Sequence, residues 1–129
     1  MTTQQPSTDD PRTLLARMMQ KELFVVLNKA LVEPAALQPY LLAHLHYVID
    51  LEKRGVLFAS GPFSDAAGRL TGSGLTIIRA SSFEEAEAIA NDDPFAKSGL
   101  RKPEIQRWTV NEGRIHVSVD LSDRGGVLT

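Results

Sequence analysis

The chain has 129 residues, a length that suits a single domain with a sizeable hydrophobic core. Its net charge is −2 and its Lys and Arg residues are scattered, which argues against nucleic-acid binding because that function needs a clustered basic face. The chain contains no cysteine, so disulfides, thiolate nucleophiles and zinc–thiolate sites are excluded.

The N-terminal residues show no signal peptide, because no cationic start is followed by an apolar run. No apolar segment approaches the ~18 residues that a membrane span needs. We therefore expect a cytoplasmic protein with no membrane partner. Residues 1–9 are polar and are expected to be disordered. Asp10-Pro11 then predicts the start of a short helix over residues 11–20.

Short apolar runs and helical spacings then alternate along the chain. Strands are expected over residues 23–27, 56–60, 74–79 and 105–110, and helices over residues 39–54 and 83–92. Gly55 is expected to end the first of these helices, and Ser82 with Glu85 forms a capping box for the second. Gly61-Pro62 is typical of a turn-rich connection between strands.

The C-terminal part alternates apolar and polar residues. Residues 111–113 predict a hairpin turn, and residues 114–121 an added strand. The strand is expected to turn four side chains inward: Ile115, Val117, Val119 and Leu121. We therefore divide the chain into an N-terminal extension (1–20), an α+β domain (21–110) and a C-terminal strand with a tail (111–129).

The order of elements is β-α-β-β-α-β plus an extra strand, which is typical of a ferredoxin-like α+β fold. In this fold an antiparallel sheet carries two helices on one face. Two helices cannot cover both faces, yet residues 24–27 read as buried on both. A second copy of the chain is the simplest cover, so we expect a homodimer with its sheets face to face.

His44 lies on the apolar side of the expected helix over residues 39–54. At 100° per residue it shares a sector with Leu41 and Val48, whereas His46 points to the opposite, solvated side. A histidine facing a sheet is desolvated, and its tautomer depends on its neighbours. The position alone favours a hydrogen-bonded core residue, with catalysis or ligand binding as the alternative.

Asp93 stands just before a proline at the expected end of the helix over residues 83–92. An acid held beside a half-buried imidazole would orient the ring, which could then move protons. No Gly-x-Ser-x-Gly motif surrounds any serine, so a serine hydrolase is not expected. His44 and His46 are two residues apart on a helix and cannot bind one ion, so we expect neither a metal nor a cofactor.

Five short motifs follow one another along residues 21–110. They are His44-Leu-x-Tyr47 with Leu51 and Gly55, then Gly61-Pro62, Ser82-Phe-Glu-Glu-Ala86, Asp93-Pro-Phe95 and a strand that ends in Trp108. In this order they resemble the YciI-like family of the dimeric α+β barrel superfamily. One departure is Leu41, because family members often carry an arginine three residues before the histidine.

The resemblance implies a small dimer whose two sheets close a barrel. It also implies a cleft in each protomer with a His–Asp pair, which here matches His44 and Asp93. One branch of the family resembles dehydrochlorinases of hydroxylated aromatics. The superfamily also includes muconolactone isomerases and cofactor-free monooxygenases.

We therefore expect a small, metal-free enzyme of the isomerase or lyase kind. His44 would act as general acid and base, and Asp93 would hold it. Tyr47 and a turn formed by Ser60, Gly61 and Pro62 would line the pocket of a small aromatic or enol-forming substrate. Two alternatives stay open: a non-catalytic module that binds a small ligand, and a purely structural His–Asp contact that supports the dimer.

Overall fold

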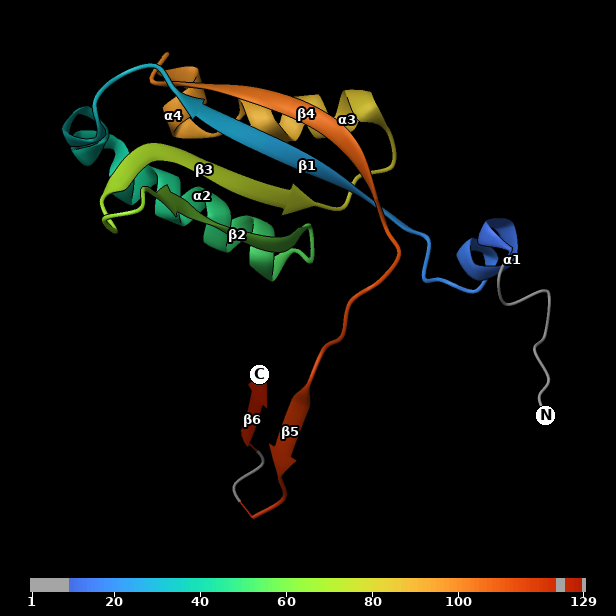
Figure 1. Ribbon diagram of the computed structural model, residues 1–129. Coiled ribbons are helices and arrows are strands. Elements are labelled where there is room, and N and C mark those ends of the chain that lie inside the picture. The colour runs from blue at the N-terminus through green and yellow to red at the C-terminus, as the bar shows by residue number, and fades with distance from the viewer. Residues whose placement is uncertain (1–9, 123–124, 129) are drawn as a thin grey trace, which may run out of the picture. The chain divides into compact units, whose positions relative to one another are not determined.

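The computed structural model describes residues 10–122 and 125–128 (Figure 1). The expectation of disorder over residues 1–9 lies outside this range. The helices are α1 (Pro11–Ala16), η2 (Pro34–Tyr40), α2 (Leu41–Lys53), α3 (Phe83–Asn91) and α4 (Pro94–Lys97). The strands are β1 (Lys21–Ala30), β2 (Leu57–Ser64), β3 (Leu70–Ile78), β4 (Arg101–Val110), β5 (Val117–Asp120) and β6 (Gly125–Leu128).

Four strands form one sheet in the order β2-β3-β1-β4. β3 runs antiparallel to both of its neighbours, so that Thr76 lies opposite Val26 of β1 and Ser60 of β2. Figure 1 shows α2 and α3 on the same side of this sheet. The expected ferredoxin-like α+β fold is thereby confirmed.

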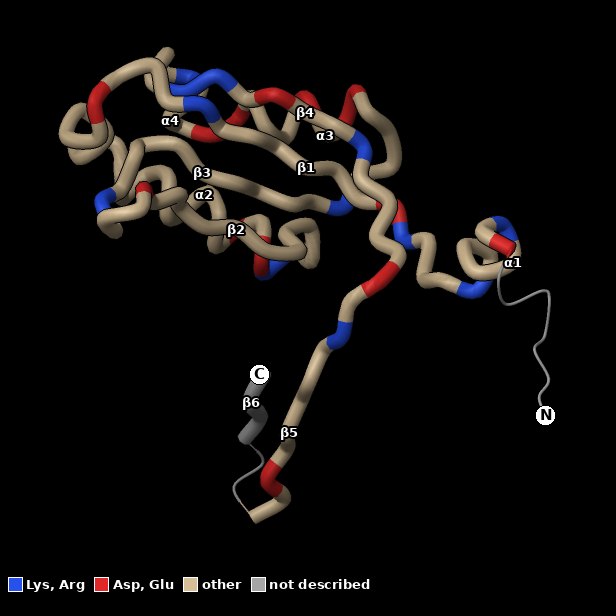
Figure 2. The backbone as a smooth tube through the Cα atoms, viewed as in Figure 1, with Lys and Arg blue, Asp and Glu red and all other residues tan. Residues whose placement is uncertain are grey.

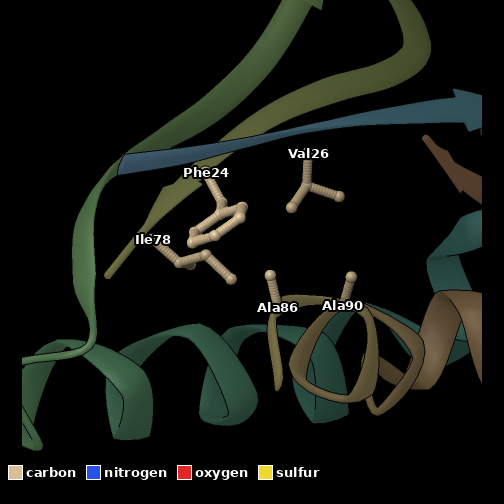
Figure 3. Close-up of a cluster of buried hydrophobic side chains, with 5 residues drawn as sticks. All are labelled: Phe24, Val26, Ile78, Ala86 and Ala90. Carbon is tan, nitrogen blue, oxygen red and sulfur yellow. The ribbon is translucent and has the colours of Figure 1, made fainter. Parts of the chain in front are cut away.

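The hydrophobic core lies between the sheet and α3. Phe24 and Val26 of β1 and Ile78 of β3 point toward Ala86 and Ala90 of α3 (Figure 3). The two alanines are small, so the helix backbone approaches the sheet closely, and full burial of each large apolar side chain contributes about 1.5–3 kcal/mol. This packing fixes the position of α3, and with it the position of Asp93, which follows the end of this helix.

The helix expected over residues 39–54 begins later than the sequence indicated. Residues Pro34–Tyr40 form a 3-10 helix, and the α-helix starts at Leu41. Pro34 and Pro39 explain the difference, because proline has no backbone N–H to donate to a regular helix. The predicted end is confirmed: Gly55 follows the helix with a φ of +76°, a conformation that glycine adopts without strain.

Gly61-Pro62 was expected in a turn and instead lies within β2, opposite Leu75 and Gly74 of β3. β2 is an edge strand, and an edge strand tolerates a proline because its outer N–H needs no partner. The actual turn follows, where the Asp65 carboxylate accepts hydrogen bonds from the N–H groups of Ala67 and Arg69.

The C-terminal strand differs from expectation. β5 pairs with β6 in a separate two-stranded sheet and does not form a hairpin with β4. The four side chains expected to face inward are 59–88% exposed, and only two of them belong to β5: Ile115, Val117, Val119 and Leu121. The chain divides into one compact unit of residues 22–109 and a second unit built from the segments on either side of it.

Charged residues of both signs are interleaved along the chain (Figure 2). Several form exposed ion pairs, such as Arg54 with Asp50 at 2.9 Å and Lys97 with Asp92 at 3.1 Å. Exposed pairs of this kind contribute at most about 1 kcal/mol each, so they do not determine the fold. Among the described residues, no helix is both long and apolar enough to cross a membrane.

Candidate active site

A pocket of about 220 Å³ opens at one end of the four-stranded sheet. It is bounded by η2, the first turns of α2, the facing ends of β2 and β3, α4 and the start of β4. Most of its wall is apolar, including Leu37, Leu41 and Phe95. His44 and Arg101 are the ionisable side chains among the described residues that line it. An apolar wall with a few polar groups is typical of a small-molecule site.

His44 lies beside Asp93, as the sequence predicted. The distance from Nδ1 of His44 to Oδ1 of Asp93 is 2.9 Å. The side chains are 15% and 4% exposed respectively, so water screens the pair little. An ionised carboxylate only accepts hydrogen bonds, which requires Nδ1 of His44 to carry the proton. The other ring nitrogen, Nε2, is then the one available to a molecule in the pocket.

Asp93 is positioned by two helices. α3 ends at Asn91, and Asp93 then caps the start of α4, where its Oδ1 accepts a hydrogen bond from the Phe95 N–H at 3.0 Å. The same oxygen therefore receives one backbone and one imidazole N–H. The expectation that Asp93-Pro94 ends a helix is confirmed, and the structure adds that it begins another one. This double role fixes the carboxylate before any ligand binds.

Phe95 supports the imidazole from its face. The two ring centroids lie 4.3 Å apart and the planes are 17° from parallel, which is a stacked arrangement. Phe95 is 1% exposed and cannot move aside without opening the core. His44 is therefore held both at Nδ1 and on one face of its ring, as an acid–base group requires.

Tyr47 takes a different place from the one expected. Its hydroxyl donates to the backbone carbonyl of Ile89 at 2.5 Å and thus joins α2 to α3. It borders a small internal space with Asp93, Asn28 and Thr76 and does not contribute to the pocket wall. Burial raises the pKa of Tyr47 above its usual value, and the nearby Asp93 carboxylate raises it further. The hydroxyl stays protonated and serves as a structural donor.

The expected lining residues of β2 are only partly at the pocket. Pro62 forms part of its wall, whereas Ser60 and Gly61 lie farther along the strand and outside that wall. Arg101 lines the pocket but was missed, because the expected fourth strand began only at residue 105 and left Arg101 in a connection. The four residues before residue 105 are Arg-Lys-Pro-Glu, which carry no apolar pattern that would have extended the expected strand back to Arg101.

Within the described parts of the chain, no group of three or more His, Cys, Asp or Glu side chains could hold a metal ion. The potential ligands nearest to His44 illustrate this. Asp93 already accepts two hydrogen bonds through Oδ1, and His46 is exposed on the other side of α2.

Comparison with known proteins gives a consistent family and fold. The model of the YCII-related domain family matches residues 16–109. An uncharacterised protein of Bacillus subtilis, YjpA, is 33% identical over 75 residues, which cover 58% of this chain and 82% of that protein. The 5-chloro-2-hydroxyhydroquinone dehydrochlorinase of Burkholderia phenoliruptrix, solved in complex with 2,5-dihydroxybenzoquinone, is 26% identical with a TM-score of 0.57. That match covers 67% of this chain and 92% of the dehydrochlorinase.

Proposed function

Because the chain belongs to the family of YCII-related domains, we propose that it is a small-molecule enzyme of the lyase or isomerase kind. His44 is its general acid and base, and Asp93 orients His44. The observation that carries this proposal is the 2.9 Å contact between Nδ1 of His44 and Oδ1 of Asp93 at the wall of an apolar pocket. An oriented imidazole at the wall of a pocket is suited to proton transfer.

The proton moves through Nε2 of His44. In the first step Nε2 takes a proton from a hydroxyl group or from a carbon next to a carbonyl of the substrate, and the ring becomes positively charged. The Asp93 carboxylate stabilises that charge through Nδ1. In an isomerisation the same proton returns to another substrate carbon. In an elimination the leaving group departs with its bonding electrons, and His44 later releases the proton to water.

The structural relative supports the elimination branch. That protein is a dehydrochlorinase of a chlorinated hydroxyhydroquinone, and it was solved with a planar dihydroxyquinone. The pocket of this chain suits a molecule of that shape, because its wall is mostly apolar and its volume of about 220 Å³ admits one substituted ring. We propose a hydroxylated aromatic or enol-forming substrate on this basis.

Isotope exchange separates an enzyme from a binding module. We expect the protein in deuterated water to catalyse chloride loss from 5-chloro-2-hydroxyhydroquinone, or proton-to-deuterium exchange in at least one member of a panel of small phenols, quinones and lactones. NMR of the small molecules and a chloride electrode give the two readouts. Saturable binding of panel members without any exchange or turnover would instead establish a non-catalytic ligand-binding module.

We also propose that the protein is a homodimer. The sheet face opposite the helices carries apolar side chains from β1, β3 and β4 that surround a shallow depression: Val25, Leu27, Leu75, Ile77 and Trp108. Within residues 22–109, α2 and α3 lie on the other face (Figure 1). A second copy of the chain covers this apolar surface with its own copy of the same surface. Two-fold symmetry requires that both subunits contribute the same residues to the interface.

A charge on the open sheet face is expected to separate the dimer. Leu27 is half-buried on this face, and the variant Leu27→Lys would place a charge in the proposed interface. Sedimentation equilibrium at micromolar concentration should give a dimer for the wild-type protein and a monomer for the variant. The variant Leu42→Lys, at an exposed position of α2, is the control and should stay dimeric. A monomeric wild-type protein would contradict the proposal.

A further inference from the structure

Arg101 is a buried cation at the pocket. It is the first residue of β4 and only 8% exposed, yet its side chain forms part of the pocket wall. Its Nε donates a hydrogen bond to the backbone carbonyl of Gly72 at 2.8 Å. That carbonyl is neutral and does not balance the charge of the guanidinium. Burial is unfavourable for such a charge unless an anion lies nearby.

Most of the hydrogen-bonding capacity of Arg101 is unused. Within the described part of the chain, its two terminal nitrogens form no hydrogen bond, and the residue forms no ion pair. Neither nitrogen is a fully buried atom that lacks a hydrogen-bond partner, and the residue lines the pocket. Asp93 attracts the guanidinium from a distance, but it is already bonded to His44 and to the Phe95 N–H.

Phe95 links Arg101 to His44. The guanidinium carbon of Arg101 lies 4.6 Å from the centroid of the Phe95 ring, and the imidazole centroid of His44 lies 4.3 Å from the same point. The guanidinium carbon and the imidazole centroid therefore lie no farther apart than the sum of these two distances. Because both residues also line the same pocket, a single aromatic molecule with polar groups at both ends can contact both of them.

We propose that Arg101 is the anion-binding residue of this pocket and that the substrate is a planar organic anion: a carboxylate, phenolate or enolate. Its oxyanion binds the terminal nitrogens of Arg101, its ring lies against the apolar wall, and its reacting proton faces Nε2 of His44. Arginine suits this role because its planar fork binds two oxygens, or one oxygen twice, in a fixed orientation. This inference rests on the proposed function and names the substrate class for the same site.

The anion site also has a use during the reaction. When His44 removes a proton from a phenol or from a carbon next to a carbonyl, negative charge develops on the substrate oxygen. A guanidinium already aimed at that oxygen stabilises the charge without reorganisation. Arg101 would therefore act both in recognition and in the proton-transfer step.

Calorimetric titration with matched ligands tests the inference. Benzoate and benzamide have the same size and shape but differ in charge, and 2,5-dihydroxybenzoquinone serves as an acidic enol. The wild-type protein is expected to bind benzoate and the quinone, and to bind benzamide more weakly. In Arg101→Met the affinity for the two anions should fall roughly ten- to a hundred-fold, the loss that corresponds to a charged hydrogen bond, while benzamide binding should change little.

Lys102→Met is the matched control. It removes the same charge from the adjacent residue, which is exposed and points to the other side of the strand. Its binding of all three ligands should equal that of the wild-type protein. Should Arg101→Met fail to fold, as judged by its melting curve, Arg101→Lys keeps the charge without the fork and should show an intermediate loss. The charge preference of the wild-type protein is measured independently of both variants.

Three outcomes would overturn the inference: equal affinity of the wild-type protein for benzoate and benzamide, no change of anion binding in the folded Arg101 variants, or no measurable binding of either anion. None of them decides the isotope-exchange experiment on the wild-type protein, which tests the proposed role of His44. Exchange that persists without a charge preference would retain the proposed enzyme and discard the anion site. A charge preference without exchange would do the reverse.

Discussion

Replacement of His44 by asparagine is expected to lower turnover or isotope exchange by roughly 10²–10⁴-fold while the protein stays folded. The amide nitrogen of asparagine can occupy nearly the position of Nδ1 and donate to Asp93, but asparagine cannot take up a proton at the pocket. We expect a stability loss of about 1 kcal/mol, because the stacking on Phe95 is reduced. Steady-state rates and thermal melting give the two values.

His46→Asn is the matched control for this substitution. His46 lies two residues away on the same helix and is exposed. Its substitution should leave the rate unchanged and should alter the free energy of unfolding by less than about 0.5 kcal/mol. A structural role for His44 predicts the opposite pattern. His44→Asn would then lose several kcal/mol of stability, and any activity found would survive in the fraction that remains folded.

Replacement of Asp93 by alanine is expected to cause the largest loss of stability, about 2–4 kcal/mol. The variant loses the cap of α4, which is typically worth about 1 kcal/mol, and leaves the His44 Nδ1–H and the Phe95 N–H without their acceptor in a buried place. Turnover should fall as well, because the imidazole is no longer oriented. Urea unfolding measured at one pH gives the difference in free energy.

Asp92→Ala shows what the neighbouring carboxylate contributes. Asp92 is exposed and pairs with Lys97 at 3.1 Å, an interaction that is worth at most about 1 kcal/mol. If Asp92→Ala destabilised the protein as much as Asp93→Ala, the loss of stability would come from removing any negative charge near the helix ends. The specific role of Asp93 as cap and hydrogen-bond acceptor would then be wrong.

The sequence was sufficient for the four-stranded sheet, for α2 and α3, and for the His–Asp pair. β1 is marked by a continuous apolar run and α2 by a helical spacing, and the Ser82 cap and the Gly55 stop are local signals that do not depend on distant contacts. His44 and Asp93 could be paired because a helix angle and an Asp-Pro boundary constrain each residue separately. The resemblance to a known family then favoured a functional role of this pair over a purely structural one.

Features that depend on tertiary context were not predictable in the same way. Pro62 reads as a turn residue, and only the edge position of β2 permits it within a strand. Tyr47 lies beside His44 on the helix, but the direction of its hydroxyl depends on where α3 packs. The alternation over residues 114–121 is real, yet the partner strand is β6 and leaves that face exposed. Arg101 joined the site only through the approach of β4 to α4.

The ¹⁵N NMR spectrum of His44, recorded with and without 2,5-dihydroxybenzoquinone, tests the acid–base role of the His44–Asp93 pair most directly. The chain has three histidines, and the variants His46→Asn and His116→Asn assign the remaining signals. In the neutral ring we expect the proton on Nδ1 and a lone pair on Nε2, with the Nε2 signal shifting when the quinone binds. A proton on Nε2, or a His44 spectrum that stays unchanged while the quinone binds, would contradict the account.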